Sequence, residues 1–228
     1  MRSGDGAEPL ICVHPAIGLT WCYTGLIPHV TDGRPVYGIQ SSGMTVGAMS
    51  ASSMDELAAR YVDLIRRVQA HGPYHLLGYS VGGAIAHAMA VRLRALGEDV
   101  GTLVMLDTQT TESIPGGART RSLGMLFAEF AGIDSDERVD DDLTPERAER
   151  LLRDSGGAYA RLTADDLRRI YDDYLHTINL GQEYRPETFD GDLVYFAADG
   201  EAGIWEPRGT ATSPVRSTPI PWATRTTA

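Results

Sequence analysis

The sequence is poor in three features that would each have indicated a class of protein: long apolar runs, cysteine and basic residues. No stretch approaches the roughly eighteen uninterrupted apolar residues that a membrane-spanning helix needs. The first six residues, Met1 to Gly6, have no apolar region behind Arg2 that could act as a secretion signal. We therefore expect a cytoplasmic protein.

Only two cysteines are present, Cys12 and Cys22, and they lack the paired spacing of a metal site or of a disulfide framework. We expect both to be small, buried, apolar residues. The balance of 20 basic against 31 acidic residues gives a net charge of -11. Nucleic-acid binding requires clustered Lys and Arg, so the composition disfavours it. An acidic protein partner stays open, provided that it docks on a local basic or apolar patch.

What the chain does contain is a regular alternation of short apolar runs with helical periodicity. Strands are predicted at residues 10–13, 36–39, 74–79, 102–106 and 191–196, and helices at 54–70 and 81–96. Such alternation predicts an α/β fold with a doubly wound, mostly parallel sheet. A length of 228 residues with 43% hydrophobic content suffices for one core, so we expect a single domain, residues 1–228.

An insertion at about residues 113–185 breaks the alternation. It contains two amphipathic patterns, one from Leu123 to Phe130 and one from Leu167 to Ile178. The acidic stretch between them, residues 134–142, is interpreted as a solvated linker and not as a metal site. We expect the insertion to form a helical lid, with Phe127, Phe130, Tyr171 and Tyr174 lining or covering the path of an apolar substrate.

The strongest local motif is Gly78-Tyr79-Ser80-Val81-Gly82, which follows an apolar strand and opens a helix. A tight strand-to-helix turn needs glycines because side chains flanking the serine would clash. The turn would hold the Ser80 hydroxyl above the sheet and aim the backbone N–H of Val81 at a developing oxyanion. The motif therefore predicts Ser80 as a nucleophile. The alternative is a glycine-rich helix start that Ser80 only caps.

A serine hydroxyl becomes nucleophilic when a histidine removes its proton and a carboxylate orients that histidine. Asp107 directly follows the apolar run Leu103 to Leu106, so it lies at the carboxyl end of a strand, where such sheets place their sites. Asp107 is the predicted acid. An aspartate that only caps a helix or a turn would occupy a similar position.

Four segments carry a resemblance to a known family: Pro9 to Gly18, Tyr37 to Gln40, Gly72 to Gly83 and Leu106 to Thr108. From about residue 8 to 207 the chain resembles the thioesterase domains that end nonribosomal peptide synthetases, which have the α/β-hydrolase fold. The resemblance implies that Ser80 is the nucleophile and Asp107 the triad acid. It also implies that the loop after His14-Pro15 supplies the second oxyanion donor, the N–H of Ala16, and that His14 is not a base.

The resemblance further implies a partner and a reaction. Members of this family take an acyl or peptidyl chain from the phosphopantetheine arm of a carrier protein domain onto the serine. They then release it to water or to an internal nucleophile. No cofactor or metal of the chain's own is implied, because the carrier supplies the phosphopantetheine.

One family feature is missing, since the catalytic histidine lies after the last strand and this sequence has no histidine beyond residue 176. The residues His29, His71, His75 and His87 all precede Asp107, and none is expected to be the base. His176 follows Asp107 but falls in the second lid helix. It is a weak candidate for the base, the alternative being a polar lid residue.

The tail, residues 208–228, contains no Asp, Glu or Leu, while six of its residues are Thr. Such a biased end is what a misread frame produces. Trp222 is encoded by TGG, Ala223 by GCN and Thr224 by ACN, so a frame starting at the last base of the Trp codon reads GGC, glycine, and then NAC. NAC encodes histidine when N is C. We hypothesise that the tail is frameshifted relative to an active ancestor, the alternative being a truly divergent or disordered tail.

Three functions are compatible with these residues. The first is a carrier-linked thioesterase that is impaired if its base is absent. The second is a free-standing esterase or editing thioesterase, and the third is a non-catalytic remnant that binds acyl chains.

Overall fold

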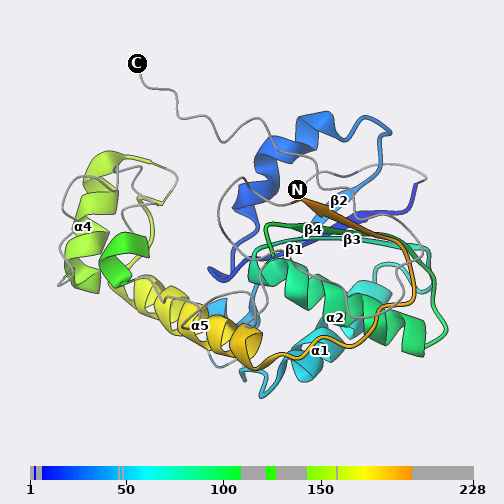
Figure 1. The fold of residues 1–228 in the computed structure, drawn as a ribbon. Helices are drawn as coiled ribbons and strands as arrows, with labels where there is room; N and C mark the ends of the chain where they lie inside the picture. Colours follow the sequence, from blue (N-terminus) through cyan, green and yellow to red (C-terminus); the bar gives the residue numbers. More distant parts are fainter. Residues whose placement is uncertain are drawn as a thin grey trace.

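A five-stranded parallel sheet forms the centre of the molecule (Figure 1). The computed structural model describes residues 3, 7–45, 47, 49–108, 122–126, 143–157 and 159–196. In chain order the strands are β1 (Leu10–Val13), β2 (Val36–Ile39), β3 (Tyr74–Tyr79), β4 (Val100–Leu106) and β5 (Leu193–Phe196). Their spatial order is β2-β1-β3-β4-β5. The parallel α/β sheet predicted from the sequence is confirmed.

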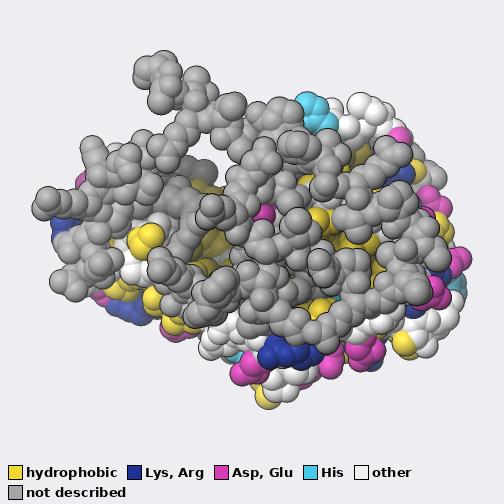
Figure 2. Space-filling model, viewed as in Figure 1, with side chains coloured by type: hydrophobic (Ala, Val, Ile, Leu, Met, Phe, Trp, Pro, Cys, Tyr) yellow, Lys and Arg dark blue, Asp and Glu magenta, His cyan; other side chains and the backbone are white. Residues whose placement is uncertain are grey.

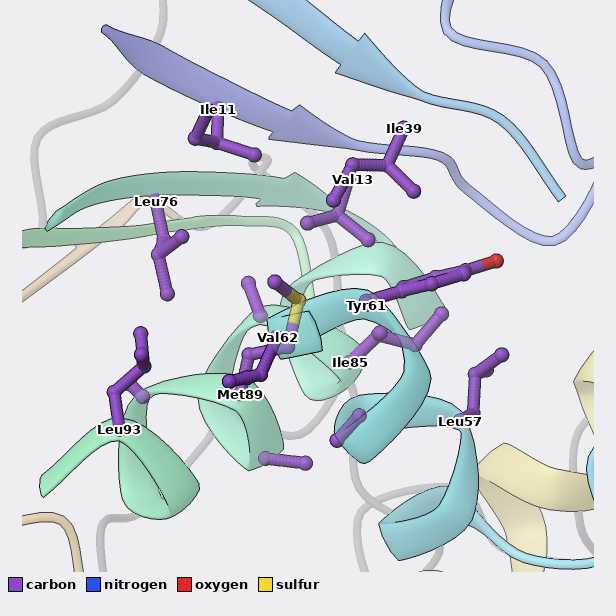
Figure 3. Packing of buried hydrophobic residues seen from close by; sticks show 14 of the residues in the cluster. Ile11, Val13, Ile39, Leu57, Tyr61, Val62, Leu76, Ile85, Met89 and Leu93 are labelled. Carbon is purple, nitrogen blue, oxygen red and sulfur yellow. The ribbon is translucent and has the colours of Figure 1, made fainter. Parts of the chain in front are cut away.

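Two helices, α1 (Met54–Arg66) and α2 (Val81–Ala95), cover one face of this sheet (Figure 1). Helix α1 begins where predicted, because the Ser53 hydroxyl accepts a hydrogen bond from the Glu56 N–H at 3.1 Å. It ends at Arg66, four residues before the predicted end. The core between the layers is apolar, and Figure 3 shows Ile11 and Leu76 from strands facing Val62, Ile85 and Met89 from the helices.

The opposite face is covered near β1 by the 3-10 helix η1 (Trp21–His29). Tyr23 is its buried residue and packs against Cys12, Val36 and Leu77. Cys12 is buried, as predicted, whereas Cys22 is exposed. The prediction that both cysteines are buried is therefore wrong for Cys22, because η1 turns its neighbour Tyr23 toward the sheet.

The inserted region contains α4 (Pro145–Ser155), α5 (Ala164–Glu183) and a short helical stretch at residues 123–126. Helix α5 leads away from the sheet and meets α4 at its far end (Figure 1). The predicted helix from Leu167 to Ile178 is confirmed by α5, whereas α4 was not predicted. Phe127, Phe130, the acidic stretch 134–142 and the tail 208–228 lie outside the described residues.

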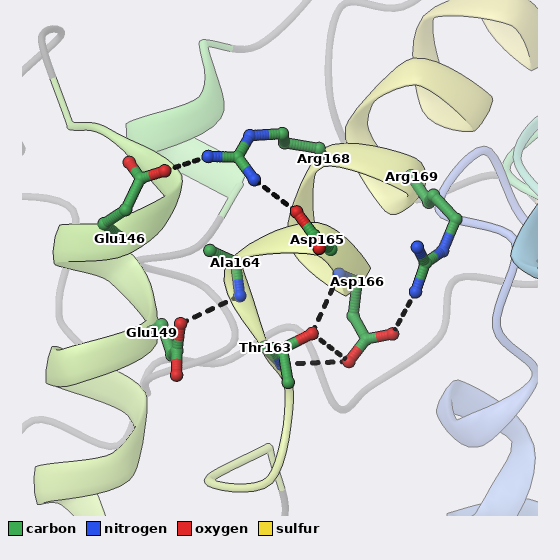
Figure 4. A network of polar contacts seen from close by, with 8 residues as sticks. All are labelled: Glu146, Glu149, Thr163, Ala164, Asp165, Asp166, Arg168 and Arg169. Atoms are coloured by element: carbon green, nitrogen blue, oxygen red, sulfur yellow. Dashed lines mark hydrogen bonds and ion pairs between the residues drawn. The ribbon is translucent and has the colours of Figure 1, made fainter.

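Polar contacts join α4 to the start of α5 (Figure 4). Arg168 pairs with Asp165 on its own helix and with Glu146 of α4. Glu149 of α4 accepts a hydrogen bond from the Ala164 N–H at 3.0 Å, which satisfies an otherwise unpaired donor in the first turn of α5. The two helices therefore form one unit around a small core of Leu143, Ala148, Leu152 and Leu167.

The surface mixes charges of both signs. Figure 2 shows acidic and basic side chains next to each other along the rim of the molecule, as expected from local pairs such as Glu56 with Arg60 and Asp166 with Arg169. Such partly exposed surface pairs contribute little to stability, typically below about 1 kcal/mol each. Among the described helices, none combines the length and apolar character needed to cross a membrane.

Two buried histidines give the fold an expected pH dependence. Burial lowers the pKa of His14 and that of His87 from 6.5 to about 4. As the pH falls from 6.5 to 4, the unfolded chain binds these protons before the folded chain does, so stability is lost across this window. Each histidine is expected to contribute about 1.4 kcal/mol per pH unit to the slope of the unfolding free energy.

The share of His87 can be isolated by urea unfolding at several pH values. His87→Gln is expected to remove about one proton from the slope between pH 4 and 6.5. Tyr184→Phe is the matched control, since it deletes the hydroxyl that lies 3.1 Å from His87 Nδ1 but leaves the ring buried. Because burial is the cause of the lowered pKa, this control should keep the slope. An equal slope in His87→Gln and the unaltered chain would contradict the assignment.

Candidate active site

Ser80 lies on a sharp turn between β3 and α2, as the motif predicts. Its backbone angles are φ 55° and ψ -132°, a conformation that L-residues rarely adopt. The Ser80 N–H donates to the Leu106 carbonyl at 2.8 Å, so the turn is fixed to the end of the neighbouring strand β4. The half-buried Ser80 side chain makes no capping hydrogen bond to the helix, so the alternative of a mere capping serine receives no support.

The glycines of the motif are required by close backbone contacts. A Cβ at Gly78 would lie 2.1 Å from the Gly82 carbonyl oxygen. A Cβ at Gly82 would lie 2.5 Å from the His14 carbonyl oxygen and 2.7 Å from that of Val13. The turn at Ser80 and the end of β1 are therefore in direct backbone contact, which only glycine permits.

Gly82→Ala is expected to destabilise the fold by about 3 kcal/mol, because the added methyl group must displace backbone and not a flexible side chain. Gly25→Ala is the matched control, since nothing lies within 4 Å of a Cβ built there. It should change the free energy of unfolding by less than about 0.5 kcal/mol. Thermal and urea unfolding monitored by circular dichroism will measure both. Equal stability of the two variants would contradict this prediction, because it would show that the backbone at the end of β1 can move to make room for the methyl group at little cost in free energy.

Asp107 emerges beside Ser80. Strands β3 and β4 pair in parallel with Tyr79 opposite Leu106. Ser80 and Asp107, the next residues, therefore lie side by side at the carboxyl ends of these two strands. Asp107 has φ 46°, and its N–H donates to the Phe196 carbonyl of β5 at 2.7 Å. In the described part of the chain, Ser80 and Asp107 are the two non-glycine residues with positive φ. Strained backbone of this kind tends to cluster at functional sites.

The loop after β1 forms the third side of the site. The His14 N–H donates to the Ile39 carbonyl at 3.2 Å, and Ala16 is buried. Ala16 belongs to an apolar cluster that also includes Val81, so the two predicted oxyanion donors come from neighbouring segments.

Helix α5 lies across these segments. Tyr174 is buried against Ala16, and Tyr171, stacked on Tyr174 with ring centroids 6.1 Å apart, packs on the same cluster. A Cβ at Gly181 would lie 2.7 Å from Val81 Cγ2, which brings the end of α5 against the start of α2. Tyr171 and Tyr174 therefore lie next to the predicted site, although their role toward an acyl chain stays a prediction.

The described residues include all six histidines of the chain, and in five of them a ring nitrogen lies within hydrogen-bonding distance of another group. The pairs are His14 with Pro15 and Tyr61, His71 with Glu98, His75 with Thr102, His87 with Tyr184, and His176 with Ala51. His176 lies on α5, with Nε2 2.8 Å from the Ala51 carbonyl oxygen. The Ala51 carbonyl can only accept, so Nε2 carries the proton, and Nδ1 is the nitrogen that would have to reach Ser80 if His176 were the base.

Two residues at the site were missed from the sequence. The Tyr23 hydroxyl donates to the Val13 carbonyl at 2.6 Å and accepts from the Tyr79 N–H at 2.7 Å, bridging β1 to the residue before Ser80. The Thr108 hydroxyl donates to the Ser80 carbonyl at 3.0 Å. The position of Thr108 could have been predicted, because it directly follows Asp107. Tyr23 could not, because the sequence of η1 has no apolar periodicity that distinguishes this tyrosine.

A parallel sheet with a strained serine between β3 and α2, and an aspartate after β4, defines a serine hydrolase of the α/β-hydrolase class. The family model described as "Thioesterase domain" matches residues 8–210. The chain belongs to this thioesterase family, as the resemblance implied.

Two proteins with sequences similar to this chain are a synthase and a synthetase. The chain is 37% identical over 198 residues to a dimodular nonribosomal peptide synthase of Bacillus subtilis (strain 168). That match covers 86% of this chain and 8% of the relative. Malpinin synthetase of Mortierella alpina is 37% identical over 195 residues, covering 83% of this chain and 2% of that protein. The chain thus spans less than a tenth of the length of either relative.

Solved structures agree on the fold. A four-domain nonribosomal peptide synthetase bound to AMP and glycine matches with a TM-score of 0.71 and 28% identity, over 86% of this chain and 16% of that one. The thioesterase domain of NocB, in a covalent complex with a fluorophosphonate nocardicin G analog, matches with a TM-score of 0.62. Its identity is 23%, over 85% of this chain and 74% of that one, so this likeness supports the fold alone.

Proposed function

We propose that this thioesterase releases an acyl or peptidyl chain from the phosphopantetheine arm of a carrier protein through an ester on Ser80. The observation that carries the proposal is a pair of residues with strained backbone: Ser80 and Asp107 each have positive φ and lie at the carboxyl ends of the adjacent strands β3 and β4. Membership of the thioesterase family supplies the bond that is broken.

In the proposed step the Ser80 Oγ adds to the thioester carbon while a base takes the hydroxyl proton. The N–H groups of Ala16 and Val81 donate to the oxyanion, which stabilises the charge that develops there. Collapse of this intermediate breaks the carbon–sulfur bond, and the proton passes to the pantetheine sulfur. The ester on Ser80 is then attacked by water or by a nucleophile within the chain. Asp107 would orient the base and stabilise its charged form.

The partner and the lid follow from the same proposal. One relative is a nonribosomal peptide synthase, so the substrate is expected on a carrier domain and the chain is expected to need no cofactor of its own. The apolar face of α5, with Tyr171 and Tyr174, would cover the acyl chain beside the oxyanion donors. Biosynthesis of a secondary metabolite by a nonribosomal synthetase is the proposed setting.

The base is the incomplete part of this proposal. Five histidines are bonded elsewhere, and the family match stops at residue 210, close to the start of the biased tail. We propose that the tail is frameshifted and that the chain as it stands acylates slowly. His176 is the alternative base.

The proposal is tested with butyryl-pantetheine, presented free and on a carrier protein, followed by intact mass spectrometry of the chain. An added butyryl mass on the peptide that contains Ser80, absent in Ser80→Ala, is the expected result. The butyrate oxygen ester of a simple alcohol is the matched comparison, and faster acylation from it would favour an esterase. Binding of the carrier-bound thioester without any added mass would favour a non-catalytic acyl-binding role.

A further inference from the structure

Both predicted oxyanion donors belong to peptide units whose carbonyl oxygens are held by two hydrogen bonds. The Ala16 N–H shares its peptide unit with the Pro15 carbonyl, and the Val81 N–H shares its unit with the Ser80 carbonyl. In each case one bond comes from a nearby backbone N–H, and the second comes from a buried side chain.

At the first unit, the Pro15 carbonyl accepts from the Gly18 N–H at 2.9 Å, and His14 Nδ1 lies 2.8 Å from the same oxygen. A carbonyl oxygen can only accept, so Nδ1 must carry the proton. The fully buried, neutral ring then accepts at Nε2 from the Tyr61 hydroxyl, 2.6 Å away. The geometry thus fixes both the orientation and the tautomer of His14.

At the second unit, the Ser80 carbonyl accepts from the Gly83 N–H at 2.9 Å and from the Thr108 hydroxyl at 3.0 Å. Thr108 is fully buried, and its own carbonyl accepts from the Tyr195 hydroxyl of β5 at 2.7 Å. The backbone of Thr108 is therefore anchored to β5.

Both peptide units are trans, so the N–H of each points away from its carbonyl. A side chain that fixes the carbonyl direction therefore also fixes the direction of the N–H on the other side of the plane. Donors that are oriented before reaction stabilise an oxyanion better than donors that must reorient.

We propose that His14 and Thr108 are positioning residues that hold the Ala16 and Val81 N–H groups toward the oxyanion. This inference rests on the proposed function, which assigns those two N–H groups as donors. It gives His14, which the family resemblance implied is not a base, a role through its neighbour's carbonyl. It also couples the loop after Asp107 to the donor beside Ser80.

The test compares two inhibitors of the unaltered chain. Butylboronic acid forms a tetrahedral adduct with Ser80 in which a boron-bound oxygen takes the place of the oxyanion. The butyramide of aminopantetheine, in which nitrogen replaces the thioester sulfur, resembles only the ground state. Loss of donor positioning should weaken the boronate and spare the amide.

Thr108→Val removes the hydroxyl with little change in volume and is expected to weaken boronate binding about tenfold, a fraction of the effect of deleting a whole donor. Thr108→Ser keeps the hydroxyl and should bind boronate like the unaltered chain. For His14, the double variant His14→Phe with Tyr61→Phe removes the bond to Pro15 without leaving a tyrosine hydroxyl unpaired. Tyr61→Phe alone retains that bond and is its control.

The outcomes separate the two proposals. If the boronate binds Ser80→Ala as well as it binds the unaltered chain, the proposed nucleophile is wrong. If binding requires Ser80 but Thr108→Val and the double variant keep full boronate affinity, the positioning inference is overturned. Equal weakening of boronate and amide would also overturn it, because that pattern indicates general damage to the site.

A measurement on the unaltered chain is independent of whether the variants fold. Long-range proton–nitrogen NMR of the histidine rings is expected to show His14 protonated at Nδ1 and unprotonated at Nε2 at pH 7. The Thr108 hydroxyl proton should exchange slowly with water. A ring protonated at Nε2, or a rapidly exchanging Thr108 hydroxyl, would contradict the positioning of the corresponding peptide unit.

Discussion

Replacing Ser80 by cysteine is expected to speed up acylation of this chain, whereas Ser80→Ala is expected to abolish it. A cysteine with an ordinary pKa of about 8.5 is roughly one-tenth thiolate at pH 7.5 and attacks a thioester without a base. A serine hydroxyl without a base must give its proton to water. We expect the cysteine variant to acylate on the order of a hundredfold faster or more, because a thiolate needs no base and so bypasses the triad member that we propose to be missing.

Release of free pantetheine thiol, followed by stopped flow, will measure this rate, and intact mass will verify the thioester on the introduced cysteine. Ser80→Ala reports any attack at other residues. Faster acylation of the serine chain than of the cysteine variant would show that a base already serves Ser80. His176 would then become the leading candidate, and His176→Ala should stop turnover.

The framework of the fold was accessible from the sequence because each strand is a short apolar run bounded by turn residues. Strands β1, β2 and β3 match their predicted bounds, and β4 begins two residues early. Alternation with helices then determined a parallel sheet, since parallel strands need crossover connections. The turn at Ser80 could also be predicted, because the glycines on both sides of the serine indicate a tight strand-to-helix turn.

Helix α4 was missed although its signals are present. The Thr144 hydroxyl accepts from the Arg147 N–H at 3.3 Å, Pro145 occupies the first turn, and Gly156 ends the helix in a left-handed conformation. Its buried face consists of only Ala148 and Leu152, so its apolar periodicity is weak beside the charged residues. Capping residues were therefore a better guide here than hydrophobic spacing.

The contacts that hold the site together were beyond the sequence for a different reason. Tyr23, 56 residues before Tyr79, binds its N–H, and Ser41 donates at 2.8 Å to Asp173, 132 residues later on α5. Such pairs depend on how the elements pack in space. Local patterns give the direction of a strand or helix, but not which hydroxyl meets which carbonyl across the sheet.

Restoring the reading frame of the tail is expected to have the largest effect on activity. In the reframed chain, residues after Pro207 are translated in the frame that reads Gly-His across the codons of Trp222, Ala223 and Thr224, about where the family resemblance places the histidine. Loss of a triad histidine in a serine protease costs on the order of a millionfold in the chemical step, while binding and oxyanion stabilisation persist. We therefore expect the reframed chain to hydrolyse butyryl-pantetheine faster by several orders of magnitude, at similar KM.

Asp107→Asn tells whether the gain comes from a working triad. In the reframed chain this variant should lower kcat about ten-thousandfold, because the histidine loses the carboxylate that sets its tautomer. In the unaltered chain the same variant should change the rate much less, since the frameshift proposal places the triad histidine only in the reframed tail. This dependence of the Asp107 effect on the tail is the signature of residues that act as a unit. Rescue that persists in Ser80→Ala, or an equally large effect of Asp107→Asn in both chains, would contradict the frameshift proposal, because the reframed tail would then not be supplying the base.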